Sequence, residues 1–336
     1  MTWTLIAKRR NALVLLAAVA VLATVALMSS RSNGGVEEWV GEFPKTDFSK
    51  TNIDLGEIVS GGPRRDTIPP IFEPKYIPIK DANDIGETEP VISVVINGDA
   101  RAYPLRILLW HEIVNDTIGG VPVLVSYCPL CNSGVVFDRR VGGKTLVFGN
   151  TGRLRRFNMV MYDRQTESWW QQFEGDSIIG ELTGQRMDLI PARLESVAKF
   201  RERAPDGLLL VPENDRARNY GLTPYERFEA RTPRAVTRYG LPEGIRPMQR
   251  VVVVGEEAWT LGLLRERKRH VAGNLVFTWE PGQNSIHDKQ VIAEGRDVGN
   301  VVVQRDVDGK LEDVPYDVAF AFAFRAFNPN GTIHQE

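Results

Sequence analysis

The stretch that decides the fold covers residues 110–137, W-H-E-I-V-N-D-T-I-G-G-V-P-V-L-V-S-Y-C-P-L-C-N-S-G-V-V-F. It holds the only two cysteines of the chain, Cys128 and Cys131, and also His111, one of four histidines. Thiols and imidazole are the side chains best suited to redox or metal chemistry near neutral pH. No other stretch gathers reactive groups so densely, so the candidate site is placed here.

The same stretch predicts three strands. Apolar, β-branched runs at residues 111–115 and 121–127 flank the turn residues Gly119 and Gly120. After the C-P-L-C motif, a Gly-containing turn leads into a third run at residues 134–140. The motif is therefore expected in a strand–turn–strand, and not at the start of a helix inside a βαβ unit.

Outward from this stretch, short strands alternate with turn residues. Asn97-Gly98 predicts a tight hairpin within residues 89–102, and Pro104 predicts the start of a short helix that ends near Trp110. Further strands are expected at 144–149, 158–162, 168–173 and 208–211, with a surface helix at 194–204. This pattern predicts a mostly β (α+β) fold of sandwich or barrel type.

Two segments of the sequence also resemble each other. Residues 94–105, V-V-I-N-G-D-A-R-A-Y-P-L, resemble residues 251–263, V-V-V-V-G-E-E-A-W-T-L-G-L. This suggests two related β units, 59–211 and 249–336, separated by a long excursion at 212–248. The alternative is two hairpins that merely share common strand and turn residues. The Phe alternation in residues 314–329 suggests a closing strand packed on one face.

The N-terminus predicts a membrane anchor. Residues 1–10 end in Lys8, Arg9 and Arg10 and are predicted to form a cytoplasmic tail. Residues 11–29 form an apolar run, which predicts a transmembrane signal anchor. A cleaved signal peptide is the alternative. Residues 30–58 read as a tether. The expected location is therefore the cell membrane, single-pass, with the C-terminal part extracytoplasmic, where two cysteines can oxidise and stay oxidised.

Composition limits the choice of partner. The chain has 336 residues, a formal net charge of −2 and 25% charged residues, which is typical of a globular protein. A charge so close to zero gives no general attraction to nucleic acid, so none is expected as a partner. The expected partners are the membrane and a thiol protein or small molecule.

The motif string identifies a family resemblance. S-G-G-P, A-R-A-Y-P-L-R-I-L, W-H-E-I-V-N-D, Y-C-P-L-C, M-Y-D-R-Q-T, S-W-W-Q and R-N-Y-G-L-T-P-Y, in this order, resemble the prokaryotic family catalogued as domain of unknown function 3179. The resemblance implies an exported or membrane-anchored protein with a C-P-x-C motif. Some members carry selenocysteine in this motif, which implies redox use of Cys128 and Cys131.

The sequence allows three interpretations of the cysteine pair. In the first, the pair is a thiol–disulfide oxidoreductase centre that needs no cofactor, with one nucleophilic and one resolving cysteine and with His111 as base or thiolate partner. In the second, Cys128, Cys131 and His111 bind zinc or copper and leave an open position, with Met159 and Met161 as soft ligands for copper. In the third, the cysteines only form a structural disulfide in a binding or scaffold domain.

The sequence also suggests a pocket beside the cysteines, formed by a second group of residues. They follow the motif in sequence and supply amides, charges and indole rings: Asn158, Tyr162, Asp163, Arg164, Trp169 and Trp170. Adjacent tryptophans in a strand face opposite sides, so one ring is expected in the core and the other could form the floor of a binding site. Structural turn and core roles are the alternative for all six.

Overall fold

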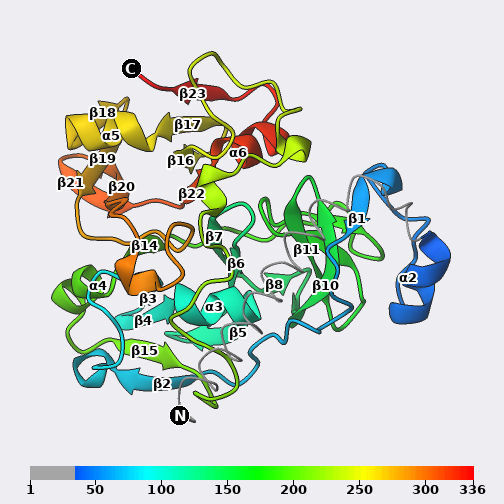
Figure 1. Ribbon diagram of the computed structural model, residues 1–336. Helices are drawn as coiled ribbons and strands as arrows, with labels where there is room; N and C mark the ends of the chain where they lie inside the picture. Colours follow the sequence, from blue (N-terminus) through cyan, green and yellow to red (C-terminus); the bar gives the residue numbers. More distant parts are fainter. Residues whose placement is uncertain (1–34) are drawn as a thin grey trace, which may run out of the picture.

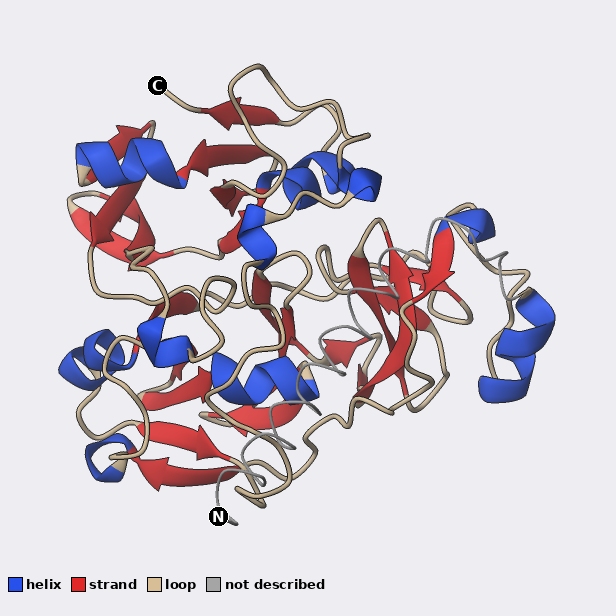
Figure 2. Cartoon of the chain, viewed as in Figure 1, coloured by secondary structure: helices blue, strands red, loops and turns tan. Residues whose placement is uncertain are grey.

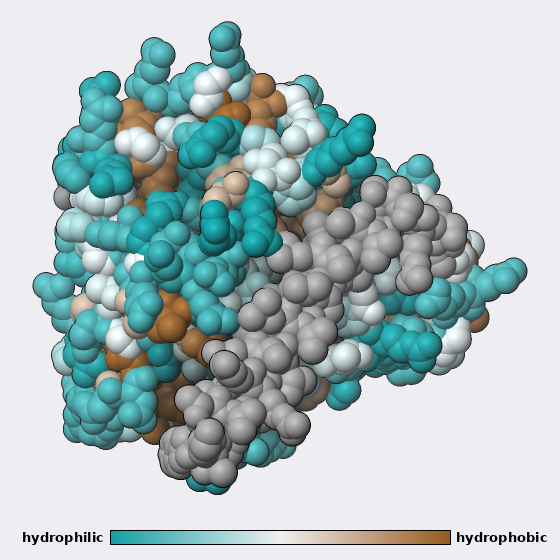
Figure 3. All heavy atoms as spheres, viewed as in Figure 1, coloured by the Kyte–Doolittle hydropathy of each residue, from teal (hydrophilic) through white to brown (hydrophobic). Residues whose placement is uncertain are grey.

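The computed structural model describes residues 35–336, and strands dominate it (Figures 1 and 2). The prediction of a mostly β fold is confirmed. The predicted cytoplasmic tail and transmembrane segment lie outside the described residues. Among the helices that are described, none is both long and apolar enough to cross a bilayer. Hydrophilic side chains cover most of the described surface on the face seen in Figure 3.

The first sheet lies in the lower part of Figure 1. Its strand order is β14-β3-β4-β15-β2, with bounds Arg193–Ser196, Pro90–Ile96, Asp99–Pro104, Leu208–Val211 and Lys75–Pro78. The hairpin predicted at Asn97-Gly98 is present as β3 and β4, and both turn residues have positive φ, 51° and 81°. Helix α3 (Leu105–His111) follows β4, and helix α4 (Val197–Arg203) follows β14.

The second sheet lies in the upper part of Figure 1 and repeats this arrangement. Its strand order is β22-β16-β17-β23, with bounds Asp317–Phe320, Arg250–Val254, Glu257–Thr260 and Thr332–His334. Helix α5 (Leu261–Arg267) follows β17, and helix α6 (Ala321–Phe327) follows β22.

Three strand pairings of the first sheet have counterparts in the second, and only the pairing of β15 with β2 has none. The hairpin β3-β4 matches β16-β17, and the antiparallel neighbour β14 matches β22. The strand that joins in parallel is β15 in the first sheet and β23 in the second, where Leu209 pairs with Ala102 and Ile333 pairs with Ala258. All four following helices have seven residues. The segments whose sequences echo each other thus occupy equivalent places.

Each unit also carries an antiparallel meander after its first helix. In the first unit it is β5-β6-β7, with bounds Ile113–Ile118, Val121–Cys128 and Ser133–Asp138. In the second unit it is β18-β19-β20-β21, with bounds Arg269–Ala272, Leu275–Glu280, Asn300–Val307 and Lys310–Asp313. The connection after β6 is a four-residue turn, residues 129–132, which begins directly after Cys128 and contains Cys131, whereas residues 281–299 connect β19 to β20.

A further sheet extends from the first unit, on the right of Figure 1. Its strand order is β1-β10-β11-β12-β13, with bounds Ile58–Ser60, Phe148–Arg155, Asn158–Asp163, Trp169–Gln171 and Ser177–Ile179. The short ribbon β8 (Arg140–Val141) and β9 (Lys144–Thr145) leads into it.

The tether prediction for residues 30–58 is wrong from residue 35 onward. Helix α2 (Val36–Glu42) precedes β1, and Trp39, Phe43 and Phe48 are buried against Trp169. These aromatic rings stabilise a packed segment through apolar burial. Arginines of β10 add ion pairs to this segment, such as Arg155 to Glu57 at 2.8 Å.

Two local expectations also differ from the structure. His111 is the last residue of helix α3 and does not begin a strand. Residues 321–327 form helix α6, where a strand was predicted. Every phenylalanine and alanine of α6 is buried, so its apolar residues point in all directions and the Phe alternation did not reflect a single buried face.

Candidate functional site

The two cysteines flank a tight turn between β6 and β7, as predicted. The Cys131 N–H donates to the Cys128 carbonyl at 3.2 Å, and the Asn132 N–H donates to the Pro129 carbonyl at 3.3 Å. Asn132 has a left-handed φ of 54°, which asparagine adopts more readily than most residues. The turn thus brings the two cysteine side chains together.

The second unit contacts this turn through several hydrogen bonds. Four hydrogen bonds join it to β22 and to the β19–β20 connection: Phe320 N–H to Cys131 O at 2.9 Å, Asn132 Nδ2 to Val318 O at 2.6 Å, Gly134 N–H to Asp317 Oδ1 at 2.9 Å, and His287 Nε2 to Pro129 O at 2.8 Å. The candidate site is therefore carried by the first unit and closed by the second.

Both cysteines are free thiols in this structure. Cys128 is 2% exposed and Cys131 is 0% exposed, and both belong to the main apolar cluster. The Cys131 thiol donates to the Phe157 carbonyl at 3.3 Å. The expectation that the sulfurs lie at a reachable spot on the surface is therefore wrong for this conformation.

The two thiols differ in acidity. Burial opposes ionisation of Cys128, but the Cys131 thiol and backbone N–H groups of Met159, Cys131 and Leu130 lower the pKa of Cys128 below its usual value. Burial and the neighbouring Cys128 raise the pKa of Cys131 well above its usual value. A thiolate at Cys128 beside a thiol at Cys131 is the arrangement expected of a nucleophilic and a resolving cysteine.

Glu112 is the acidic group of this site. Its own backbone, with a φ of 57°, ends helix α3 and directs the chain into β5. Burial, followed by the proximity of Cys128, raises the pKa of Glu112 to about 8, while a hydrogen bond from Asn150 lowers it. Asn150 Nδ2 also lies 3.2 Å from Met159 Sδ. A carboxyl group with a pKa near neutrality can take up or release a proton beside Cys128.

His111 does not take the role that was predicted for it. Its Nδ1 lies 2.8 Å from the Pro69 carbonyl, and its Nε2 lies 2.9 Å from the Tyr220 hydroxyl. Both ring nitrogens are thus engaged away from the cysteines, and burial lowers the pKa of the ring. The ionisable neighbour of Cys128 is instead Glu112, the residue that follows His111.

Of the six pocket candidates, only Asn158 reaches the cysteines. Its side chain lowers the pKa of Cys131, against the larger effect of burial, and is fixed by Gln171 and Gln172 at 2.6 Å each. Asn158 begins strand β11, and a role for it in a pocket stays a prediction.

The other five candidates have structural roles. Trp169 and Trp170 are both fully buried, and Trp170 Nε1 donates to Asp163 at 3.0 Å. Tyr162 donates to Asp66 at 2.5 Å, and the partly exposed Arg164 lies 3.6 Å from the same carboxylate. The expected floor of a binding site is therefore part of the core. Met159 and Met161 are buried in that core as well.

Two aromatic residues near the turn were missed. His287 is fully buried, and its ring contacts Tyr225, Phe228 and Phe320 at centroid distances of 5.8, 5.6 and 5.1 Å. Charges on Glu112 and Cys128 contribute to raising the pKa of Tyr225, although burial is the larger cause. Neither residue lies near the motif in sequence, so no local pattern pointed to them.

Over residues 35–336, no group of three or more His, Cys, Asp and Glu side chains is arranged to hold a metal ion. Two surface pockets, one beside His287 and one beside Arg193, include neither cysteine in their lining.

The fold and the site together define a mostly β protein with a buried pair of unequal thiols and an adjacent carboxyl group. The chain belongs to the family described as protein of unknown function DUF3179, whose model matches residues 65–331. Neither the curated proteins nor the solved structures contain a match.

Proposed function

We propose that Cys128 and Cys131 form a thiol–disulfide redox centre, with Cys128 as nucleophile and Cys131 as resolving thiol. The observation that carries this proposal is geometric: one tight turn holds two free thiols together in the interior, with the Glu112 carboxyl group beside Cys128. The lowered pKa of Cys128 and the raised pKa of Cys131 support Cys128 as the nucleophile.

The exchange reaction follows from these positions. The Cys128 thiolate attacks one sulfur of a substrate disulfide, whose S–S bond breaks and releases a first substrate thiolate. Glu112 transfers its proton to that leaving group and then accepts the proton of Cys131. The Cys131 thiolate attacks the Cys128 sulfur and expels the second substrate thiolate. Two electrons thus pass from the dithiol to the substrate. Glu112 ends protonated, as it began, and the second substrate thiolate takes a proton from solvent.

Burial restricts the substrate. Because the thiols are 2% and 0% exposed, a protein disulfide cannot reach them without local opening of the turn. A small disulfide or another small oxidant is therefore the substrate class that fits best. The four hydrogen bonds from the second unit are the contacts that such an opening would break.

The proposed location comes from the sequence alone. Basic residues followed by the apolar run at 11–29 support a single-pass anchor in the cell membrane, with the redox centre on the extracytoplasmic side. Fractionation of cells tests this proposal. The full chain should remain in washed membranes, whereas a chain of residues 35–336 should be recovered in the soluble fraction.

Mixed-disulfide trapping tests the redox proposal. In Cys131→Ser, Cys128 has no resolving partner, so 2-hydroxyethyl disulfide should leave a stable adduct of one hydroxyethylthio group per chain. Cys128→Ser should react at least about tenfold more slowly, because the thiolate fraction falls about tenfold for each unit by which a pKa lies higher. Intact-mass spectrometry at timed intervals measures both rates.

The two variants are each other's control, because each keeps one of the two cysteines of the chain. In denaturant their rates should become similar, which would show that the fold creates the difference. Equal rates in the folded state, or a faster reaction of Cys128→Ser, would contradict the assignment. Metal analysis of the wild-type protein measures the alternative, in which the same thiols bind zinc or copper.

A further inference from the structure

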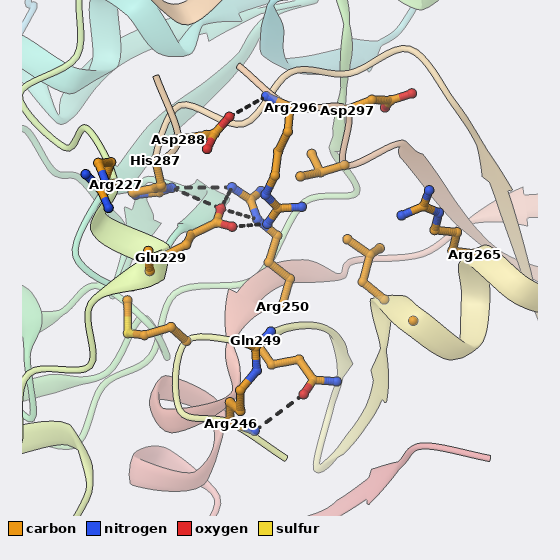
Figure 4. A pocket seen from close by; sticks show the side chains of 15 residues that line it. Arg227, Glu229, Arg246, Gln249, Arg250, Arg265, His287, Asp288, Arg296 and Asp297 are labelled. Atoms are coloured by element: carbon orange, nitrogen blue, oxygen red, sulfur yellow. Dashed lines mark hydrogen bonds and ion pairs between the residues drawn. The ribbon is translucent and has the colours of Figure 1, made fainter. Parts of the chain in front are cut away.

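A basic pocket lies between the excursion, residues 212–248, and the second unit (Figure 4). Its volume is about 500 Å³, within the range of roughly 300–1,000 Å³ that is typical of small-molecule sites. Five arginines and three acidic residues line it, and the arginines are Arg227, Arg246, Arg250, Arg265 and Arg296.

The acidic residues of the pocket are already engaged by groups of the protein. Glu229 binds Arg250 at 2.6 Å and also forms an ion pair with Arg296. Asp297 accepts backbone N–H groups of the loop that it belongs to, including that of Gly299 at 2.8 Å. Asp288 accepts the Arg296 N–H at 2.8 Å. These carboxylates are therefore occupied within the fold.

The base of the pocket is rigid and buried. Arg250 is 5% exposed, and its Nη2 donates to Glu229 and to Ser285 Oγ at 2.9 Å. His287 lies beside it, 3.3 Å from the same Nη2. Burial and Arg250 lower the pKa of His287 to about 3, so the ring is neutral and its Nε2–H is committed to the Pro129 carbonyl.

The rim carries three further guanidinium groups. Arg227, Arg246 and Arg265 are exposed, and no ion pair joins them to an acidic side chain within the described part of the chain. They come from three separate segments, and Figure 4 shows them spaced around the opening. Five arginines against three carboxylates give the lining a net positive charge, and three of these guanidinium groups have no acidic partner among the described residues, so the site favours a ligand with negative charge.

We propose that this pocket binds a small polyanion, an organic molecule that carries at least two carboxylate or phosphate groups. The polar lining disfavours an apolar ligand, and rim arginines from three separate segments suit a ligand with more than one charged group. This site differs from the redox centre and does not require it. The two are physically connected, because His287 joins the pocket base to the turn between the cysteines.

Isothermal titration calorimetry of the full chain at low ionic strength tests the proposal, with pyrophosphate and citrate as separate probes. The two probes distinguish phosphate from carboxylate recognition. At least one should bind saturably, and binding should weaken as salt is added, because ionic contacts at an open pocket are screened. The double variant Arg246→Gln/Arg265→Gln should weaken binding at least about tenfold, which corresponds to about 1.4 kcal/mol.

Arg267→Gln is the matched control, because Arg267 lies on the same helix α5 as Arg265, is exposed and does not line the pocket. It should bind the probe as the wild type does. Circular dichroism establishes that both variants fold. The proposal is overturned if neither probe binds. It is also overturned if Arg267→Gln weakens binding as much as the double variant does. Failure of the thiol-trapping experiment would leave this result unaffected.

Discussion

Glu112 shows how one residue's backbone determines the chemistry of the candidate site. Its left-handed conformation ends helix α3, and the side chain enters the apolar interior beside Cys128. The preceding residue, His111, occupies the last helical position and contacts Pro69 and Tyr220 instead. A carboxyl group placed without a cation beside a thiol is stable there chiefly in its protonated form.

The raised pKa of Glu112 predicts a pH-dependent stability that Glu112→Gln should remove. The pKa rises from 4.5 in the unfolded chain to about 8 in the folded protein, so the folded state binds more protons between these values. The stability of the wild type should therefore fall by a few kcal/mol as the pH rises from about 5 to 8. Glutamine keeps an acceptor for Asn150 but does not ionise.

Urea unfolding at pH 5, 6.5 and 8 measures this effect. The wild type and Glu112→Gln should be closest at pH 5, and the variant should gain relative stability at each higher pH. Parallel pH dependence of the two proteins would mean that Glu112 is already ionised in the folded state.

At the scale of elements, the sequence predicted those whose signals are local. The β3-β4 hairpin follows from Asn97-Gly98, and the strand–turn–strand around the cysteines follows from β-branched runs on both sides of a turn. Helix α6 did not follow, because its alternating Phe and Ala residues are all apolar and carry no periodic polar face. The site residues His287 and Tyr225 could not be predicted, because long-range packing alone brings them to the turn.

Helix α2 is another element that was not predicted from the sequence. Its segment is polar overall, but Trp39 and Phe43 are four residues apart and therefore share one face of a helix. That face packs on Trp169, whose ring centroid lies 5.3 Å from that of Trp39 and 5.0 Å from that of Phe43. The spacing was the available signal for a docked segment, and average polarity concealed it.

Trp39→Ala should release this segment while the rest of the protein stays folded. Truncation of a buried tryptophan costs about 3–5 kcal/mol, and Trp39 is one of three aromatic rings by which this segment packs on Trp169. Trypsin should then cut at Lys45 and Lys50 much faster than in the wild type. Val40→Ala is the matched control on the same helix, because Val40 is 49% exposed, and its digestion should be unchanged. Equal digestion of both variants would mean that the ion pairs of β10 alone hold the segment.

At the scale of the whole molecule, the repeated units share their cores. One apolar cluster combines Leu124 and Cys128 of the first unit with Val251 and Phe320 of the second. The other cluster combines residues of β3 and β6 with residues of β16 and β19 in the same way. The strand pairings repeat, and the two larger apolar clusters contain residues of both units, whereas two smaller clusters belong to the first unit and its N-terminal segment alone. The two units are therefore expected to unfold together as one cooperative body.

Asn132 is the residue through which this cooperativity can be tested. Its side chain accepts from the Tyr127 hydroxyl at 3.0 Å and donates to the Val318 carbonyl of the second unit at 2.6 Å. Asn132→Gly removes both bonds and leaves two buried polar groups without partners, at a cost of about 2–5 kcal/mol. Glycine accepts the left-handed φ readily, so backbone strain does not contribute.

Asn97→Gly is the matched control, because Asn97 is an exposed asparagine with a similar φ of 51°. This variant should change the free energy of unfolding by less than about 1 kcal/mol. Hydrogen exchange measured by mass spectrometry under increasing urea should show β3 and β16 losing protection together, at a lower urea concentration in Asn132→Gly. If only the strands of one unit lost protection earlier, the units would be separate cooperative bodies, and the second unit would not be needed to hold the turn that carries the thiols.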